Sequence, residues 1–442
     1  MANYQKFFDE AKKQNIEALE ISVTKNKNFS FSLFRSEIDS YQISDSFALE
    51  ARGIYHGKIG YARSEKMDAT TVDYILSHIK ENATLTTSED TPFIFKGSEK
   101  YHKKNIYSKA LENTPAEEKI VMLKELDGKI RAKSNKINEV EAFYEETTSD
   151  FSMLNSYGLK LTSKSNYSVV YASALANDES GETKNGMSFK ILEDLSKWNI
   201  EEMADKVVSE TLSQFGSKPC KSGKYKCVLG PSAVSSLLSA YLANLSSEQV
   251  QKNASLLANK KNEKVASSKL TVTENPLQKN VFFRYFDDEG VATYNKALIK
   301  NGVLQTYLYN LKTANKDSVA STGNGYKGRG GQVGISLVNV AIKPGKLSEE
   351  ELVEKAGNGI YIDELSGLHA GLNAQSGNFS LLSKGFLIED GKKTKPVALI
   401  TSAGNLFDIF KNVTAVGNNV EMRPNSYQVP SLLIKEISIS GE

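Results

Sequence analysis

The stretch FLIEDGKKTKPVALI, Phe386 to Ile400, decides the fold class of the C-terminal half. It places two apolar runs, residues 386–388 and 397–400, around the pair Asp390-Gly391. Asp-Gly favours a tight turn because both residues tolerate positive φ, so the flanking strands fold back antiparallel. Asn301-Gly302 has the same position between residues 297–299 and 303–304. These hairpins predict a C-terminal domain dominated by antiparallel, barrel-like β-sheet.

The N-terminal half combines strands with amphipathic helices. Phe29, Phe31 and Leu33 alternate with polar or opposite-facing residues, which is typical of a half-buried strand. His56-Gly57 predicts a further hairpin within residues 51–62. Expected helices span about Tyr4–Gln14, Thr70–Asn82, Ala116–Ala132 and Ile200–Gln214, the third with Val121, Leu123, Leu126 and Ile130 on its apolar side. The fold class is therefore α+β, with an N-terminal mixed α/β domain whose antiparallel sheet is flanked by helices.

The length of 442 residues exceeds what one hydrophobic core usually serves, which favours two domains. The break Ser217-Lys218-Pro219 follows the last N-terminal helix and divides the chain into expected domains 1–218 and 219–442. Beyond it, a strand at Tyr225–Leu229 leads through Gly230-Pro231 into an expected helix over about Ala233–Leu245.

Composition narrows the class of protein. The 55 basic and 53 acidic side chains leave a net charge of +2, which gives no overall field for attracting nucleic acid. No apolar stretch is long enough to cross a bilayer, and residues 1–13 lack the pattern of a secretory signal. Two cysteines are too few for a disulfide framework, so reduced thiols are expected. We therefore expect a cytoplasmic protein with no nucleic-acid or membrane partner.

The sequence offers few residues for metal or nucleophilic chemistry. Its four histidines are too far apart to form a zinc motif. They are His56, His78, His102 and His369. Cys220 and Cys227 lack the C-x-x-C spacing, and although nearby lysines could lower a thiol pKa, a buried thiol is the simpler interpretation. The sequence contains no G-x-S-x-G motif, so a serine hydrolase is not supported.

Two loop segments are candidate binding sites. Asp287, Asp288, Glu289 and Gly290 follow the aromatic run 281–286, which we expect to be a strand. The cluster is interpreted as a turn with an acidic rim, because a hard cation needs six or more oxygen ligands. Residues 323–328 match G-x-G-x-x-G, but no buried strand precedes them and no helix follows, so a dinucleotide site is not supported. This glycine-rich loop, with Lys327 and Arg329, could bind a carboxylate or be flexible.

Several segments together resemble the TldD/PmbA family in order and spacing. In the C-terminal half they are Ser376-Gly377-Asn378-Phe379-Ser380, residues 385–392 and 395–397, Gly404-Asn405-Leu406-Phe407 and residues 416–419. Residues 286–290 and 322–324 look like other signature segments of that family, and the hairpin around His56 is similar to its N-terminal domain. The resemblance thus spans nearly the whole chain.

TldD-type members of that family carry an H-E-x-x-x-H helix whose histidines, with a cysteine near the C-terminus, hold a catalytic zinc. The resemblance places this pattern on the helix after Gly230-Pro231, where Ser239, Ala240 and Asn244 replace the first histidine, the glutamate base and the second histidine. No cysteine follows Cys227. Without a metal to polarise the carbonyl and activate water, this helix has no agent for peptide hydrolysis.

The resemblance implies the PmbA kind, also called TldE, from a family with the older label modulator of DNA gyrase. It implies a non-catalytic, metal-free subunit that pairs with a zinc-bearing TldD-like subunit in a metalloprotease of unfolded peptides, with no cofactor in this chain. Two rivals remain: a stand-alone peptide- or ligand-binding homodimer, and an enzyme whose relocated metal site uses His369 and the Asp287 cluster. Candidate peptide contacts are Asp287, Asp288, Glu289, Gly290, Gly323, Asn324, Arg329, Asn373, Gly377 and Asn405.

Overall fold

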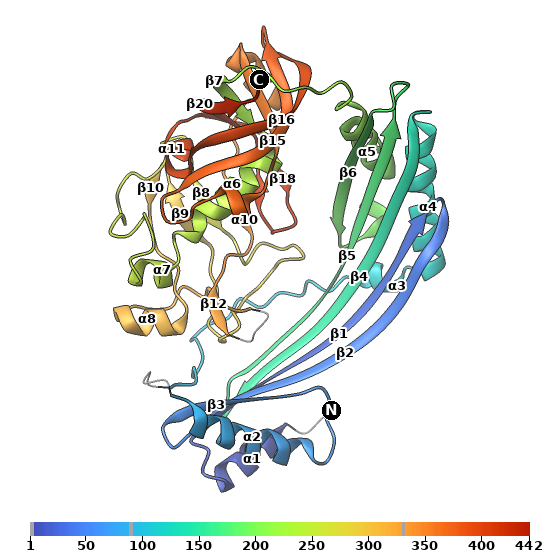
Figure 1. The fold of residues 1–442 in the computed structure, drawn as a ribbon. Helices are drawn as coiled ribbons and strands as arrows, with labels where there is room; N and C mark the ends of the chain where they lie inside the picture. Colours follow the sequence, from blue (N-terminus) through green and yellow to red (C-terminus); the bar gives the residue numbers. More distant parts are fainter. Residues whose placement is uncertain (1–3, 88–91, 329–331) are drawn as a thin grey trace. The chain divides into compact units, whose positions relative to one another are not determined.

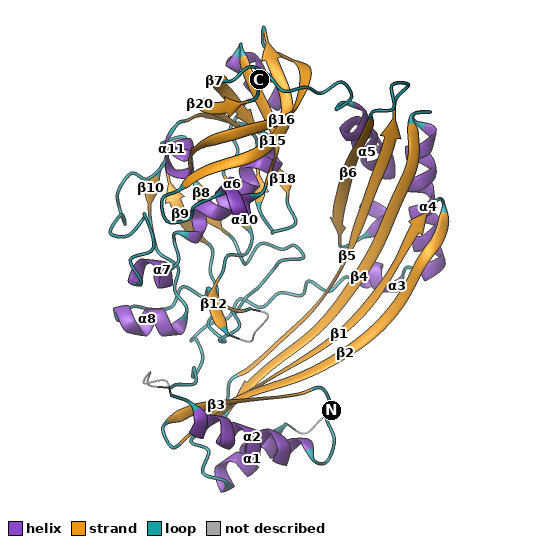
Figure 2. Ribbon diagram, viewed as in Figure 1, coloured by secondary structure: helices purple, strands orange, loops and turns teal. Residues whose placement is uncertain are grey.

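The computed structural model describes residues 4–87, 92–328 and 332–442. The chain forms two compact units, Met1–Leu212 and Ser213–Glu442. Both units combine helices with mainly antiparallel strands (Figures 1 and 2), so the expected α+β class is confirmed.

The N-terminal unit is built on a six-stranded antiparallel sheet in the order β3-β2-β1-β4-β5-β6. Its strands are β1 (Ala18–Phe34), β2 (Glu37–Tyr55), β3 (Lys58–Ser64), β4 (Ile137–Asn155), β5 (Lys160–Asn177) and β6 (Thr183–Leu192). His56 and Gly57 have φ of 49° and 68°, as the tight hairpin between β2 and β3 requires. The turn between β1 and β2 is as tight but uses Arg35 and Ser36, with φ of 51° and 64°.

The helices of this unit cover one face of the sheet in two groups. They are α1 (Gln5–Lys13), α2 (Thr71–Leu85), α3 (Lys109–Asn113), α4 (Ala116–Ala132) and α5 (Ile200–Leu212), with a short 3-10 turn at Leu195–Lys197. Leu19 and Ile21 of β1 pack in the core under α1 and α2, whereas Phe31 and Leu33 pack under α3, α4 and α5. Because these positions on β1 are an even number of residues apart, both helix groups lie on the same face.

The C-terminal unit contains a closed barrel. Its strands β7 (Gly223–Leu229), β14 (Gly359–Ser366), β15 (Asn378–Glu389), β16 (Lys392–Asn405) and β20 (Leu432–Ser440) follow the order β16-β15-β14-β7-β20. Pairing of Thr401 with Ser440 and of Ala403 with Ser438 joins β16 to β20 and closes the ring. The sixth strand, β17 (Val413–Val416), pairs with β20 outside this ring. Asp390 and Gly391 form the expected β15–β16 turn, with φ of 50° and 74°.

A second sheet and several helices complete this unit. The sheet order β10-β9-β8-β13-β19-β18 joins β8 (Val272–Glu274), β9 (Lys296–Lys300), β10 (Val303–Leu304), β13 (Val340–Ile342), β18 (Glu421–Met422) and β19 (Gln428–Val429). A separate ribbon pairs β11 (Gly325–Lys327) with β12 (Val333–Ile335). The helices are α6 (Pro231–Ala243), α7 (Ser247–Gln251), α8 (Leu311–Asp317), α9 (Glu349–Ala356), α10 (Leu368–Gly371) and α11 (Leu406–Lys411). The Asn301-Gly302 hairpin forms as expected between β9 and β10.

Two local expectations are wrong. Val121 does not belong to the buried side of α4: its side chain is 64% exposed, whereas Leu123 is fully buried. The two residues are about 200° apart around the helix axis, so they cannot share a face. Residues 281–286 do not form a regular strand, because the Phe283 amide closes a turn on the Asn280 carbonyl and the Arg284 amide bonds back to the Pro276 carbonyl.

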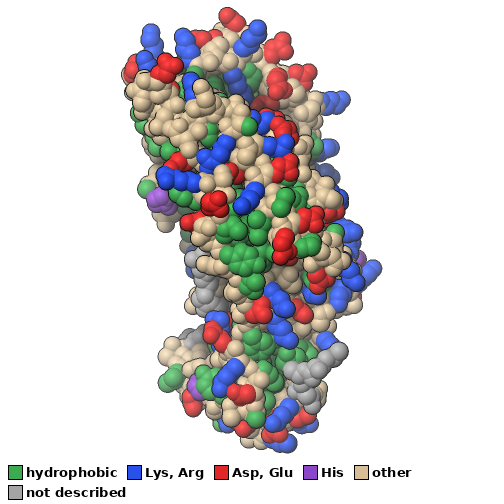
Figure 3. All heavy atoms as spheres, turned by 90° about the vertical axis from the view of Figure 1, so that its right-hand side faces the viewer, with side chains coloured by type: hydrophobic (Ala, Val, Ile, Leu, Met, Phe, Trp, Pro, Cys, Tyr) green, Lys and Arg blue, Asp and Glu red, His purple; other side chains and the backbone are tan. Residues whose placement is uncertain are grey.

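The surface mixes both signs of charge. Figure 3 shows Lys and Arg interspersed with Asp and Glu on the face drawn, in keeping with the nearly balanced composition. In the part of the chain that the structure describes, no helix combines the length and apolar character needed to traverse a bilayer.

Candidate functional site

The helix α6 carries the three positions at which the family resemblance places a zinc motif. It begins at the N-cap Gly230 with Pro231 in its first turn, and its buried side includes Leu238 and Tyr241. The Tyr241 hydroxyl donates to the Val265 carbonyl at 3.0 Å, and its ring lies 4.7 Å from that of Phe410. These contacts fix α6 in the core of the C-terminal unit.

The side chains at the three motif positions do not fit a zinc ion. Ser239 is exposed, Ala240 has no ligand atom, and Asn244 is buried at the C-cap of α6. The Asn244 amide donates to the carbonyls of Ala240 at 3.3 Å and Tyr241 at 3.4 Å, so it satisfies the end of its own helix. Zinc prefers imidazole, thiolate or carboxylate ligands, and none is present here.

No alternative cluster replaces this motif within residues 4–87, 92–328 and 332–442. Over those ranges, no three His, Cys, Asp or Glu side chains come together as a metal-ligating group. The hypothesis of a relocated metal site using His369 and the Asp287 cluster therefore has no ligand set among them.

The acidic turn at residues 287–290 points inward rather than forming an exposed rim. Asp287 is fully buried and Glu289 is 5% exposed. One Asp287 oxygen accepts from the Glu289 and Val291 amides, both at 3.0 Å, and the other accepts from the Gly325 amide at 2.9 Å. The interpretation as an acidic rim is thus wrong for these two residues, whose oxygens bond to the chain's own backbone.

The other members of this group tie the turn to the β11–β12 ribbon and to α8. Glu289 accepts from the Leu311 amide at 2.7 Å, at the N-terminus of α8. Asp288 accepts from the Lys327 amide at 2.9 Å and from Arg284 at 3.2 Å. Gly290 takes a φ of 83°, which favours glycine at the turn. The fold therefore brings residues 287–290 together with the start of the glycine-rich segment.

The glycine-rich segment is a close-packed ribbon where it is described. A Cβ added at Gly325 would lie 2.3 Å from a Glu289 oxygen, and one at Gly323 would lie 2.9 Å from the Ala292 carbonyl oxygen. Gly323 also has a φ of 70°. Glycine at these positions permits close approach of the acidic turn. Arg329 lies outside the described residues.

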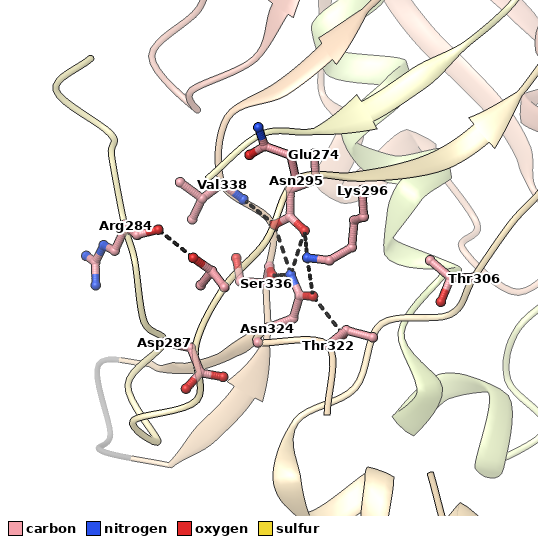
Figure 4. A network of polar contacts seen from close by, with 12 residues as sticks. Glu274, Arg284, Asp287, Asn295, Lys296, Thr306, Thr322, Asn324, Ser336 and Val338 are labelled. Carbon is pink, nitrogen blue, oxygen red and sulfur yellow. Dashed lines mark hydrogen bonds and ion pairs between the residues drawn. The ribbon is translucent and has the colours of Figure 1, made fainter. Parts of the chain in front are cut away.

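Asn324 joins a buried polar network that sequence patterns did not single out (Figure 4). Lys296 forms an ion pair with Glu274 at 2.6 Å, and both side chains are almost fully buried. The Asn324 amide donates to both Glu274 oxygens at 2.9 and 3.0 Å, and its oxygen accepts from Lys296 at 3.2 Å. The Val338 amide donates to Glu274 at 2.9 Å. Every charge in this network is thus paired.

A weak sequence signal for this network does exist. Glu274 shares the buried face of β8 with Val272, and Lys296 shares that of β9 with Leu298. A charged residue at a core position of an alternating strand indicates a buried pair, but the partner cannot be named without the register.

Asn373, Gly377 and Asn405 form a second group beside α11. Asn405 caps that helix by accepting from the Phe407 amide at 3.0 Å, and its amide donates to the Ser376 carbonyl at 2.9 Å. Asn373 accepts from the Ser376 amide at 2.9 Å, and the Gly377 amide donates to the Asn373 carbonyl at 2.8 Å. The family-signature segments at 376–380 and 404–407 therefore build one capped turn.

The two cysteines are buried structural thiols. Cys227 is fully buried and Cys220 is 6% exposed, and burial raises the pKa of both thiols. Because the thiolate is the reactive form, we expect both to react with a disulfide reagent about a hundredfold more slowly in the native protein than in guanidinium. Ellman's reagent measures this directly, and fast native reaction of either thiol would contradict it.

Two family models match most of the C-terminal unit and the second half of the N-terminal unit. Residues 222–441 match the PmbA/TldA metallopeptidase C-terminal domain, and residues 109–215 match the central domain of the same group. A Thermotoga maritima crystal structure, described as a candidate modulator of a DNA gyrase, is 30% identical, with a TM-score of 0.89 and 99% of both chains covered. The chain belongs to the PmbA/TldD family.

Other members of the PmbA/TldD family agree with this assignment. The chain is 32% identical over 292 residues to the metalloprotease PmbA homolog of Buchnera aphidicola and 28% identical over 273 residues to metalloprotease PmbA of Escherichia coli O157:H7. These alignments span 62% and 58% of the two relatives, and 65% and 61% of this chain. TldE from Thermococcus kodakarensis, at 23% identity, shares the fold with a TM-score of 0.90.

In this PmbA/TldD family member, the buried Asp287 should make the free energy of unfolding depend on pH. Burial and the nearby charge of Glu289 raise the pKa of Asp287 to about 8, against the opposing effect of its three amide donors. The folded protein then holds a proton that the unfolded chain lacks between about pH 4 and pH 8. The proton on Asp287 therefore adds most to the free energy of unfolding below about pH 4. Its contribution declines as the pH rises from about 4 to about 8, and it is absent at higher pH.

We therefore expect the stability difference between the wild type and Asp287→Asn to change with pH. The free energy by which the wild type is more stable than the variant should fall from pH 5 to pH 8.5, because Asp287 loses its proton in this range whereas the asparagine does not titrate. Urea unfolding followed by far-UV circular dichroism measures it, with fluorescence of the single tryptophan, Trp198, reporting on the N-terminal unit separately. Parallel pH profiles for the two proteins would mean that Asp287 is ionised throughout.

Proposed function

We propose that this chain is the metal-free, non-catalytic subunit of a PmbA/TldD-type peptidase complex, completed by a zinc-bearing TldD-like subunit. The observation that carries the proposal is the chemistry of α6: Ser239, Ala240 and Asn244 stand where the resemblance places two histidines and a glutamate. Its relatives named metalloprotease PmbA support a role in peptide processing. Two buried free thiols suit a reducing, cytoplasmic location.

Because α6 lacks zinc ligands, the proposal assigns peptide cleavage to the partner and peptide binding to this chain. In the complex, zinc on the partner would polarise the peptide carbonyl and activate water. This chain would contribute surfaces that hold unfolded peptide in extended form, a mode in which backbone hydrogen bonds provide affinity with little sequence selectivity. The exposed or partly exposed candidates, such as Asn373 and Asn405, suit contact with peptide better than the fully buried Asp287.

Co-purification tests the proposed function. The chain is purified without chelator, alone and with an H-E-x-x-x-H family member from its native cell, and peptide cleavage and bound zinc are measured. We expect cleavage and stoichiometric zinc only when the partner is present, with co-elution of the two chains. A partner whose motif glutamate is replaced by glutamine should still co-elute but should not cleave.

Two outcomes would overturn the proposal. Zinc-dependent cleavage by this chain alone would restore a catalytic role. A homodimer that binds peptide but neither co-elutes with the partner nor changes its cleavage rate would support the stand-alone binding protein instead.

A further inference from the structure

We draw no further inference here: the strongest candidate, the side-chain cluster of Asp363 with the ion pairs Lys384–Glu364 and Lys393–Glu349 beside the N-terminus of α6, carries no proposal, because no second feature in the described part of the chain shows what would bind to these carboxylates.

Discussion

Replacing Lys296 with methionine is expected to destabilise the C-terminal unit by about 3–5 kcal/mol, because Glu274 is left as an uncompensated buried charge. Both side chains of the pair are at most 5% exposed. Asn324 and the Val338 amide also donate to Glu274, but neither carries a charge. Removing the cation therefore leaves the carboxylate with dipoles only, in surroundings that water cannot reach.

The cysteines provide a measurement specific to this unit. Cys220 and Cys227 both lie in the C-terminal unit and are buried, so their labelling in a guanidinium series reports on its unfolding. Labelling of Lys296→Met should begin at a clearly lower guanidinium concentration than labelling of the wild type. The matched control is Lys252→Met, which removes the exposed Lys252–Glu248 pair and should change stability by less than about 0.5 kcal/mol.

A double variant separates the charge effect from loss of packing. Lys296→Met combined with Glu274→Gln removes both charges, so it should recover a large part of the lost stability. If the double variant is as unstable as the sum of the single variants, the effect comes from packing and not from an unpaired carboxylate. An unchanged unfolding midpoint for Lys296→Met itself would show that the pair is not buried.

Substituting alanine for Gly60 should cost the N-terminal unit about 2–4 kcal/mol, because overpacking at a fixed backbone contact forces strand and helix apart. Gly60 lies in β3, and a Cβ there would sit 1.9 Å from the Ile79 carbonyl oxygen of α2 and 2.8 Å from the Ala83 nitrogen. Both neighbours are backbone atoms of a helix, so no flexible side chain can move aside. The loss should appear as a lower urea midpoint of Trp198 fluorescence.

Gly128→Ala is the opposite control in the same unit. Gly128 lies within α4, and a Cβ there would meet nothing within 4 Å. Alanine in a helix interior is favoured over glycine by roughly 0.5–1 kcal/mol, so this variant should be more stable than the wild type. Equal effects of the two substitutions would refute the close contact between β3 and α2.

Some elements of the fold could be predicted because their causes are local. His56-Gly57, Asn301-Gly302 and Asp390-Gly391 all take positive φ at both turn positions, as that residue chemistry favours. The turn at Arg35-Ser36 adopts the same geometry without glycine or asparagine, so no turn residue signalled it. Long strands β1 and β2 on either side fix its conformation instead.

The candidate site could also be predicted only in part. The missing zinc ligands can be read from the residues alone, since serine, alanine and asparagine have no imidazole or thiolate wherever they are placed. The contacts of the acidic turn could not be predicted: whether Asp287 lies on a rim or in the core depends on the Gly325 amide, 38 residues away. The predicted peptide contacts remain predictions.

By itself, the sequence determined the hairpins, the main helices, the family and the absence of zinc-binding chemistry on α6, because each depends on residue identity and short-range spacing. Only the tertiary structure decided the closure of the barrel by β16 and β20 and the pairing of Glu274 with Lys296. These features arise from strand register and burial between distant segments. Periodicity shows which face of a strand is buried, but not which residue lies across from it.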